Sequence, residues 1–352
     1  MVLWADGAGT APWNSEQSIS EEVFGDDRFR QHARSLALAQ TVGRSPRRVM
    51  ALKTRLDQNV RALQDAHRRI EVWLASGHAL TPAAEWLGNN SHVVEELVSQ
   101  IRQSLPDRYY NQLPKLVDGP LAGYPRIFSI AWAYVAHTDS QSERQNLKTF
   151  VAAYQDVTPL SIGELWALPI SINLVLVENL RRASGRVIKA RNERLDADQK
   201  IALHQTSKAA ISDSDFHLID SEDGQIRRSY AVQLLRRVAD IEATRDEVRA
   251  SIAKAIAAFG LTPEDLVNAE HQSVASTNST VRHIVRSMRT MADVQWASLV
   301  EELSLVDAEL RKSPAYGLMD FATRNAYRTE IEALARRCSR TEVEIAKCAV
   351  ET

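Results

Sequence analysis

Cysteine is scarce in this 352-residue sequence, which contains only Cys338 and Cys348. If one helix carries both, their ten-residue separation places them roughly 15 Å apart, beyond the reach of a disulfide. The nine histidines are scattered, and no Cys or His cluster has zinc-like spacing. We therefore expect two reduced, buried thiols and no structural zinc.

Long apolar runs are also missing. The longest, residues 165–177, contains Pro169, Ser171 and Asn173, and it is shorter than the about 20 residues that cross a bilayer. The first 17 residues lack the basic and apolar regions of a signal peptide. With 25% charged residues, 44% hydrophobic residues and a net charge of −2, the composition is typical of a soluble globular protein. We expect this chain to stay in the cytoplasm.

Sequence signatures of catalysis are absent as well. There is no G-x-S-x-G motif, and Gly7-Ala8-Gly9 lacks the lysine of a phosphate-binding loop. Glu85 and Glu164 would suit a glycosidase only if their carboxyl groups lay about 5–9.5 Å apart. The chain has 45 acidic residues, so such pairs arise freely, and the sequence does not favour a hydrolase.

What the chain has in abundance is helical periodicity, which predicts an all-α, multi-helix bundle. Four capping boxes are expected to begin helices: Ser18-x-x-Glu21, Ser140-x-x-Glu143, Ser161-x-x-Glu164 and Ser339-x-x-Glu342. We predict helices at residues 20–42, 47–75, 82–104 with a break at 88–90, 107–117, 124–136, 141–155, 161–190, 230–258, 263–291, 293–312, 317–337 and 340–350.

The polar, glycine-containing stretch at residues 213–229 divides the pattern in two. We therefore predict four parts. They are a flexible N-terminus at 1–18, an N-terminal helical subdomain at 19–212, a linker or long loop at 213–229, and a C-terminal helical subdomain at 230–352.

Several long blocks of sequence resemble one family. They include LTPAAEWLGNNSHVVEELVSQIRQSLPDRYYNQLPKL from residue 80, GYPRIFSIAWAYVAHTD from residue 123 and FVAAYQDVTPLSIGELWALPISINLVLVENLRR from residue 150, with further blocks at 29–40, 261–296 and 319–350. These blocks resemble the N-terminal cytoplasmic region of bacterial cyclic β-1,2-glucan synthases. The resemblance implies a cytoplasmic section of an inner-membrane, UDP-glucose-dependent glucosyltransferase.

The same resemblance implies that the chemistry lies elsewhere. The family's Gln-x-x-Arg-Trp motif does not occur in this chain. UDP-glucose and a divalent metal would then belong to a transferase domain outside this sequence, and no cofactor is expected here. The implied partners are that transferase domain and a phosphorylase-like domain, in the same or another chain, and the chain alone is expected to be inactive.

Aromatic and charged residues between positions 80 and 182 suggest a carbohydrate or partner groove, since sugar sites combine aromatic faces with carboxylates or arginine. The candidates are Glu85, Trp86, His92, Tyr124, Arg126, Trp132 and Trp166. The alternative is that these aromatic rings form core, which is the usual role of aromatic residues at helical spacing.

A basic stretch stands near the N-terminus, with eleven Lys or Arg residues and two acids between Arg28 and Arg69. It predicts a membrane-facing basic surface that includes Arg44, Arg47, Arg48, Lys53 and Arg55. Two alternatives are a solvated face that pairs with acidic helices, and a nucleic-acid surface. The sequence pI of about 6.5 argues against nucleic acid.

Overall fold

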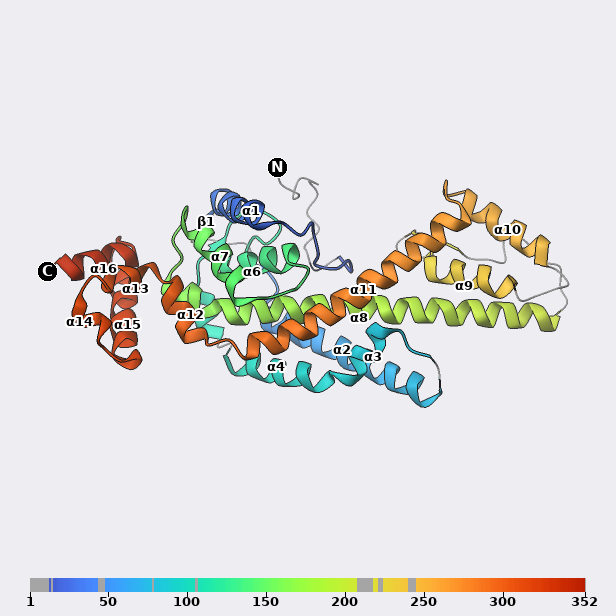
Figure 1. The fold of residues 1–352 in the computed structure, drawn as a ribbon, viewed down its shortest axis with the longest axis horizontal. Coiled ribbons are helices and arrows are strands. Elements are labelled where there is room, and N and C mark those ends of the chain that lie inside the picture. Colours follow the sequence, from blue (N-terminus) through green and yellow to red (C-terminus); the bar gives the residue numbers. More distant parts are fainter. Residues whose placement is uncertain are drawn as a thin grey trace. The chain divides into compact units, whose positions relative to one another are not determined.

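The computed structural model describes residues 13, 15–43, 48–77, 79–104, 107–207, 218–220, 224–239 and 245–351 (Figure 1). These residues form sixteen helices and two strands of two residues each. The all-α, multi-helix fold predicted from periodicity is therefore confirmed. No helix among the described residues is both long and apolar enough to span a membrane.

The helices follow the chain in this order: α1 (Asp26–Ala39), α2 (Leu52–Ala75), α3 (Pro82–Asn89), α4 (Ser91–Ser104), α5 (Asp107–Gln112), α6 (Arg126–His137), α7 (Arg144–Gln155), α8 (Ile162–Ser207), α9 (Arg228–Ala239), α10 (Arg245–Ala257), α11 (Pro263–Ala292), α12 (Trp296–Leu303), α13 (Leu305–Leu310), α14 (Pro314–Gly317), α15 (Phe321–Arg337) and α16 (Glu342–Glu351). The strands are β1 (Val42–Gly43) and β2 (Lys115–Leu116), which pair antiparallel.

The chain divides into two compact units, each assembled from separate segments. The first unit comprises residues 1–61, 90–181 and 283–352, and the second comprises residues 62–89 and 182–282. The expected linker at 213–229 falls within the second unit, and its residues 213–217 and 221–223 lie outside the described residues.

The core of the first unit forms around α6, in which all twelve residues are buried. A helix that is apolar on every side must be enclosed by its neighbours. Its Tyr134 and the α7 residues Phe150 and Tyr154 have no exposed surface. Phe29 of α1 lies 4.7 Å from Phe150 between ring centroids, so α1 packs on α7 through aromatic contacts.

The chain before α1 is extended rather than helical, so the predicted start at Ser18-x-x-Glu21 is wrong. Asn179 of α8 explains the difference, because its side chain forms hydrogen bonds with both the N–H and the carbonyl of Ile19. The Ile19 N–H donates to Asn179 Oδ1 at 2.8 Å, and Asn179 Nδ2 donates to the Ile19 carbonyl at 3.1 Å. The side chain thus takes the Ile19 carbonyl, which a helix starting here would have paired with an N–H one turn later, and it also satisfies the Ile19 N–H.

Only one of the other three predicted capping boxes forms as expected. Ser161 Oγ accepts from the Glu164 N–H at 3.2 Å, and Glu164 Oε2 accepts from the Ser161 N–H at 3.0 Å. The box predicted at Ser140 is wrong, since α7 begins after Glu143 with no side-chain cap. The last box lies two residues later than predicted, between Thr341 and Glu344.

Several predicted helix boundaries shift for identifiable reasons. The helix expected at 107–117 ends at Gln112, because Pro114 has no N–H with which to continue the helix. The Pro114 carbonyl instead accepts a hydrogen bond from the Arg126 N–H at 2.8 Å. The helix expected at 293–312 divides at Ser304, whose Oγ accepts from the Asp307 N–H and begins α13. The helix expected at 161–190 continues to Ser207, with Pro169 inside it.

The second unit has a separate aliphatic core. Leu234 of α9, Ile252 and Ile256 of α10 and Ala197 of α8 are fully buried there. The single helix predicted at 230–258 includes residues 240–244, which lie outside the described residues. The break predicted near residue 90 is confirmed between α3 and α4.

Neither Cys338 nor Cys348 forms a disulfide, and both are exposed, so the expectation of buried thiols is wrong. Cys338 follows the last residue of α15, and Cys348 lies on α16. The residues of these two helices that are buried in their shared core are Ile331 and Ala346 instead. The face that carries Cys348 is therefore left outside.

Candidate functional site

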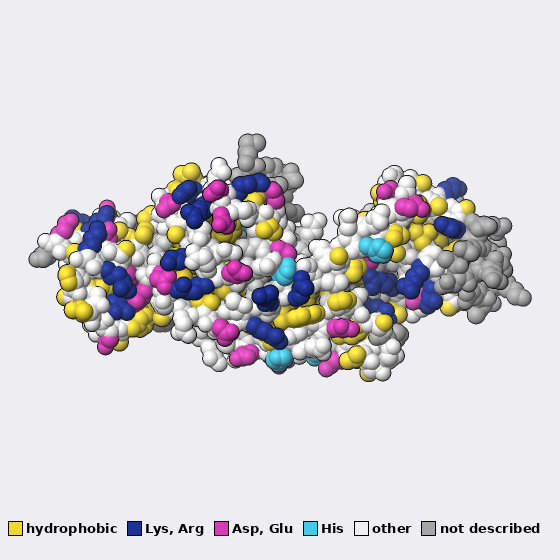
Figure 2. Space-filling view, viewed as in Figure 1, with side chains coloured by type: hydrophobic (Ala, Val, Ile, Leu, Met, Phe, Trp, Pro, Cys, Tyr) yellow, Lys and Arg dark blue, Asp and Glu magenta, His cyan; other side chains and the backbone are white. Residues whose placement is uncertain are grey.

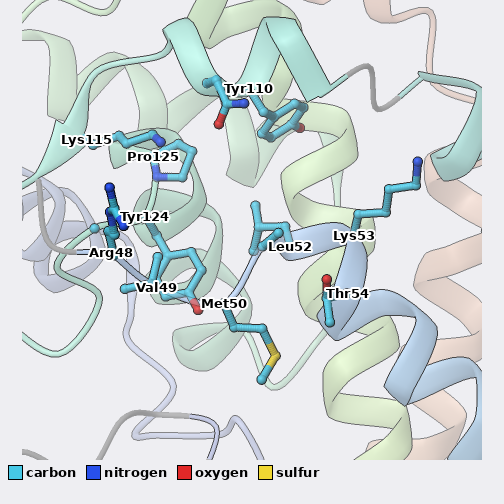
Figure 3. Close-up of a pocket in the computed structure, with 13 residues that line it drawn as sticks. Arg48, Val49, Met50, Leu52, Lys53, Thr54, Tyr110, Lys115, Tyr124 and Pro125 are labelled. Atoms are coloured by element: carbon cyan, nitrogen blue, oxygen red, sulfur yellow. The ribbon is translucent and has the colours of Figure 1, made fainter.

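A pocket of about 660 Å³ opens in the first unit (Figure 3). We call it the basic pocket, and its lining comes from three segments of chain. They are the approach to α2 and its first turn, the end of α5, and the strand and turn around β2. The lining residues are Arg48, Val49, Met50, Ala51, Leu52, Lys53, Thr54, Tyr110, Asn111, Lys115, Gly123, Tyr124 and Pro125.

The strand pair and a tight turn shape one wall of the basic pocket. Leu116 of β2 donates its N–H to the Tyr124 carbonyl and accepts from the Gly123 N–H at 2.8 Å. Gly123 has a φ of 91°, a left-handed conformation that a side chain would strain. The glycine therefore allows the chain to reverse and return Tyr124 and Pro125 to the pocket.

The charges of the basic pocket have a single sign. Arg48, Lys53 and Lys115 line it, and the lining residues that the structure describes include no Asp or Glu. In the view of Figure 3, Arg48 and Lys115 lie at one side and Lys53 at the other. Elsewhere, basic and acidic side chains are interspersed over the face that Figure 2 shows. The pocket is therefore suited to an anion.

Aromatic side chains form the floor of the basic pocket. Tyr124 is 4% exposed, and its hydroxyl accepts from Trp13 Nε1 at 2.7 Å. The Trp13 ring lies edge-on to Tyr124 and to Trp132, at centroid distances of 5.4 and 5.7 Å. Burial raises the pKa of the Tyr124 hydroxyl, which is therefore a neutral hydrogen-bonding group. Trp13 lies within the stretch predicted to be a flexible terminus, yet its ring packs here.

Arg126 and Glu164 form a buried ion pair behind this floor. Arg126 Nε and Nη2 donate to the two carboxylate oxygens of Glu164 at 2.8 and 2.6 Å, and Nη2 also donates to the Pro159 carbonyl. Burial would lower the pKa of Arg126, but the hydrogen bonds and charge of Glu164 outweigh it and raise that pKa. The pair has the geometry of a structural tie between α6 and α8.

The predicted membrane-facing residues have different surroundings. Arg55 donates to both oxygens of Glu178, whose side chain is 1% exposed, and Asn59 donates to the same carboxylate. Arg48 and Lys53 are exposed and line the basic pocket. Arg44 and Arg47 lie outside the described residues.

Many other basic residues between positions 28 and 69 also have acidic partners, which supports the interpretation as a paired, solvated face. Besides Arg55, the described pairs are Arg28 with Glu22, Arg34 with Asp156, and Arg68 and Arg69 with Asp65. Because these basic side chains pair with carboxylates, fewer of them can bind the phosphates of a nucleic acid.

The residues predicted to line one groove are dispersed by the fold. Tyr124, Arg126 and Trp132 are buried at 4–5% exposure. His92 is exposed on α4, whereas Glu85 and Trp86 belong to α3 in the second unit. The sequence gives residue types and helical faces, but which helices become neighbours depends on packing.

Trp166 lies at a second pocket of the first unit, of about 470 Å³, between the start of α8 and α15. Its ring stands edge-on to Phe321 at 6.4 Å, and Asn325, Thr329 and Glu332 also line the pocket. We call this the aromatic pocket.

Sequence reasoning missed a buried polar network at the aromatic pocket. Arg328, 1% exposed, donates from Nε to Asp307 Oδ2 at 2.9 Å and also pairs with Glu301. The Tyr316 hydroxyl donates to Asp307 Oδ1 at 2.8 Å. Glu301, Arg324 and Arg328 share the helical spacing of ordinary exposed residues, so only the packed structure distinguishes them.

Neither pocket has the ligands of a metal centre. Across the part of the chain that the structure describes, no group of three or more His, Cys, Asp or Glu residues is placed to hold a metal ion. The arrangement can instead bind an anion at the basic pocket and a ring-shaped ligand at the aromatic pocket.

The chain is 36% identical over 339 residues to the cyclic β-(1,2)-glucan synthase NdvB of Rhizobium meliloti (strain 1021). The similarity covers 95% of this chain but only 12% of that relative. The chain thus spans about one eighth of the relative's length. A search of family models gave no match.

Proposed function

Because this chain is related to a region of a cyclic β-(1,2)-glucan synthase, we propose that it is a non-catalytic helical module of such a synthase. It docks against the glucosyltransferase and phosphorylase-like domains and orients them during synthesis of the cyclic glucan. UDP-glucose and a divalent metal bind to the transferase domain, outside this chain. The module works at the cytoplasmic face of the inner membrane.

The observation that carries this proposal is how the buried carboxylates of the first unit are held. Glu164, Glu178 and Asp307 are each at most 1% exposed, and each accepts hydrogen bonds from an arginine. A general acid or base must exchange a proton with substrate, whereas a carboxylate held by a guanidinium is a structural tie. These groups rigidify a scaffold, which is what a docking module requires.

The C-terminal helices offer a surface for docking. Leu318, after α14, is 89% exposed, and Tyr327 and Leu334 of α15 are 48% and 50% exposed. Tyr327 and Leu334 are seven residues apart, which places them on one stripe of the helix. We infer that this apolar surface is covered by the transferase domain of the same synthase.

Co-purification tests the docking. The chain is expected to bind the transferase-containing remainder of an NdvB-type synthase, and Leu318→Asp with Leu334→Asp to weaken that binding at least tenfold, because an aspartate is costly to bury without a partner. Leu203→Asp, at a side chain that is 66% exposed in the second unit, is the matched control and should leave binding unchanged. Equal binding by both variants would contradict the docking surface.

A radiolabel assay tests the non-catalytic part. The purified chain is expected to incorporate no glucose from labelled UDP-glucose, while its mixture with the remainder of the synthase does. Polymer formed by the chain alone would refute the proposal.

A carbohydrate-binding module is the second candidate, and the aromatic pocket is the observation that favours it. The Trp166 and Phe321 rings supply apolar faces for a sugar, while Asn325, Thr329 and Glu332 supply partners for its hydroxyls. The ligand would be the linear β-1,2-glucan that is being extended.

Calorimetry with linear β-1,2-glucan separates the two candidates. If the module binds glucan, Trp166→Ala should weaken binding at least tenfold with an unchanged helical circular-dichroism spectrum. Trp86→Ala in the second unit is the matched control. The absence of heat at millimolar glucan would leave docking as the function.

A further inference from the structure

We propose that the basic pocket is a docking site for an anionic membrane surface, and that it receives the phosphate of one phospholipid headgroup. The proposal goes beyond docking between synthase domains and rests on different residues. The charge, the apolar rim and the volume of the pocket support it.

The charge of the basic pocket complements a phosphate. Arg48 and Lys53 are exposed cations on the approach to α2 and in its first turn, and Lys115 of β2 is half-buried. The face in Figure 2 carries basic and acidic side chains interspersed, whereas the described lining of this pocket carries only positive charge. Basic side chains near an anionic leaflet contribute about 1 kcal/mol each, or roughly fivefold in affinity.

The rim of the basic pocket is apolar and exposed. Val49 and Met50, both lining residues, are 37% and 40% exposed. Val42 of β1 and Val117, which follows β2, are 42% and 40% exposed at the strand pair that carries Lys115. Exposed aliphatic side chains beside cations are the composition of surfaces that lie in the membrane interface.

The interior of the basic pocket suits a polar headgroup. Its volume of about 660 Å³ lies within the range of small-molecule sites. The Tyr124 hydroxyl accepts from Trp13, so its own proton can be donated to a phosphate oxygen. Figure 3 shows this hydroxyl beside Met50, where the polar floor meets the apolar rim. Tyrosine is enriched at the same depth in membrane proteins.

A free phosphate would use the cations but not the rim. Val49 and Met50 would then be exposed to water both in the free protein and in the phosphate complex, so they would add nothing to the binding free energy. A lipid surface uses both features, because its phosphates meet the cations while its upper acyl chains meet the rim. This difference assigns the lipid rather than a soluble phosphate.

Vesicle flotation with the full chain tests the proposal. We expect binding to vesicles of phosphatidylcholine mixed with phosphatidylglycerol but not to phosphatidylcholine alone, and weaker binding as salt rises. The triple variant Arg48→Gln/Lys53→Gln/Lys115→Gln should bind on the order of 100-fold more weakly. Met50→Ser should weaken binding severalfold at every salt concentration.

The matched control is Arg286→Gln/Arg337→Gln/Lys347→Gln, which removes the same charge at exposed positions outside the pocket. If it weakens binding as much as the pocket variant, attraction by net charge alone replaces the proposal. Calorimetric binding of inorganic phosphate without vesicle binding would overturn the lipid assignment. Failure of either kind leaves the co-purification test of Leu318 and Leu334 unaffected, so the two proposals are separable.

Discussion

Replacing Arg328 by methionine is expected to lower the free energy of unfolding by about 3–5 kcal/mol, because it leaves a buried charge without its partner. Asp307 has no exposed surface, and Arg328 Nε and Nη2 both donate to its carboxylate. The methionine fills most of the volume, so the loss reports on charge rather than on a cavity.

Urea unfolding followed by circular dichroism measures this change. Arg336→Met is the control, since Arg336 pairs with Glu332 on the same helix but its side chain is 54% exposed. The control should change stability by about 0–1 kcal/mol. A loss below 1 kcal/mol for Arg328→Met would mean that Asp307 finds another partner or takes up a proton.

The second large effect depends on pH and arises at Glu342. The pKa of this carboxyl is raised from 4.5 to about 7, mainly by burial and also by the nearby Glu332 and Glu164, against a hydrogen bond from the Ile162 N–H and the charge of Arg336. The folded protein therefore holds this proton more tightly than the unfolded chain. The resulting stability is fully present below pH 4.5 and is lost as pH rises through 7.

Glu342→Gln should remove this dependence. The variant is expected to match the wild type near pH 4 and to exceed its free energy of unfolding by about 3 kcal/mol at pH 8. Urea midpoints across this pH range measure the difference. Glu344→Gln is the contrasting control, because hydrogen bonds from Thr341 lower the pKa of Glu344 and its loss should destabilise at high pH. A pH-independent gain in Glu342→Gln would contradict the assignment.

Helix existence was largely predictable from the sequence, because apolar periodicity reports directly on the buried face of each helix. Helix starts were less predictable. Ser161 and Glu164 form the expected box, but the same pattern at Ser18 fails because Asn179, distant in sequence, captures the backbone of Ile19. A capping pattern describes a local preference, and tertiary hydrogen bonds can override it.

The candidate site was only partly predictable. The basic stretch before α2 indicated Arg48 and Lys53, which do line the basic pocket. Lys115 gave no such signal, because it reaches the pocket only through the pairing of β1 with β2. Arg55 belongs to the same basic stretch, yet its guanidinium pairs with the buried Glu178 of α8 and lies outside the lining of the pocket. Sequence composition locates charge along the chain, but long-range contacts decide where each charged side chain lies.

The exposed thiols of Cys338 and Cys348 have a practical consequence. Neither cysteine forms a disulfide, both are exposed, and Arg340 Nη1 donates to Cys348 Sγ at 3.0 Å. Maleimide reagents should therefore modify the native chain at the end of α15, the helix that carries Tyr327 and Leu334, and on α16, which packs against it. A fluorophore placed there reports docking without any engineered residue, and preparations without a reductant are expected to accumulate covalent dimers.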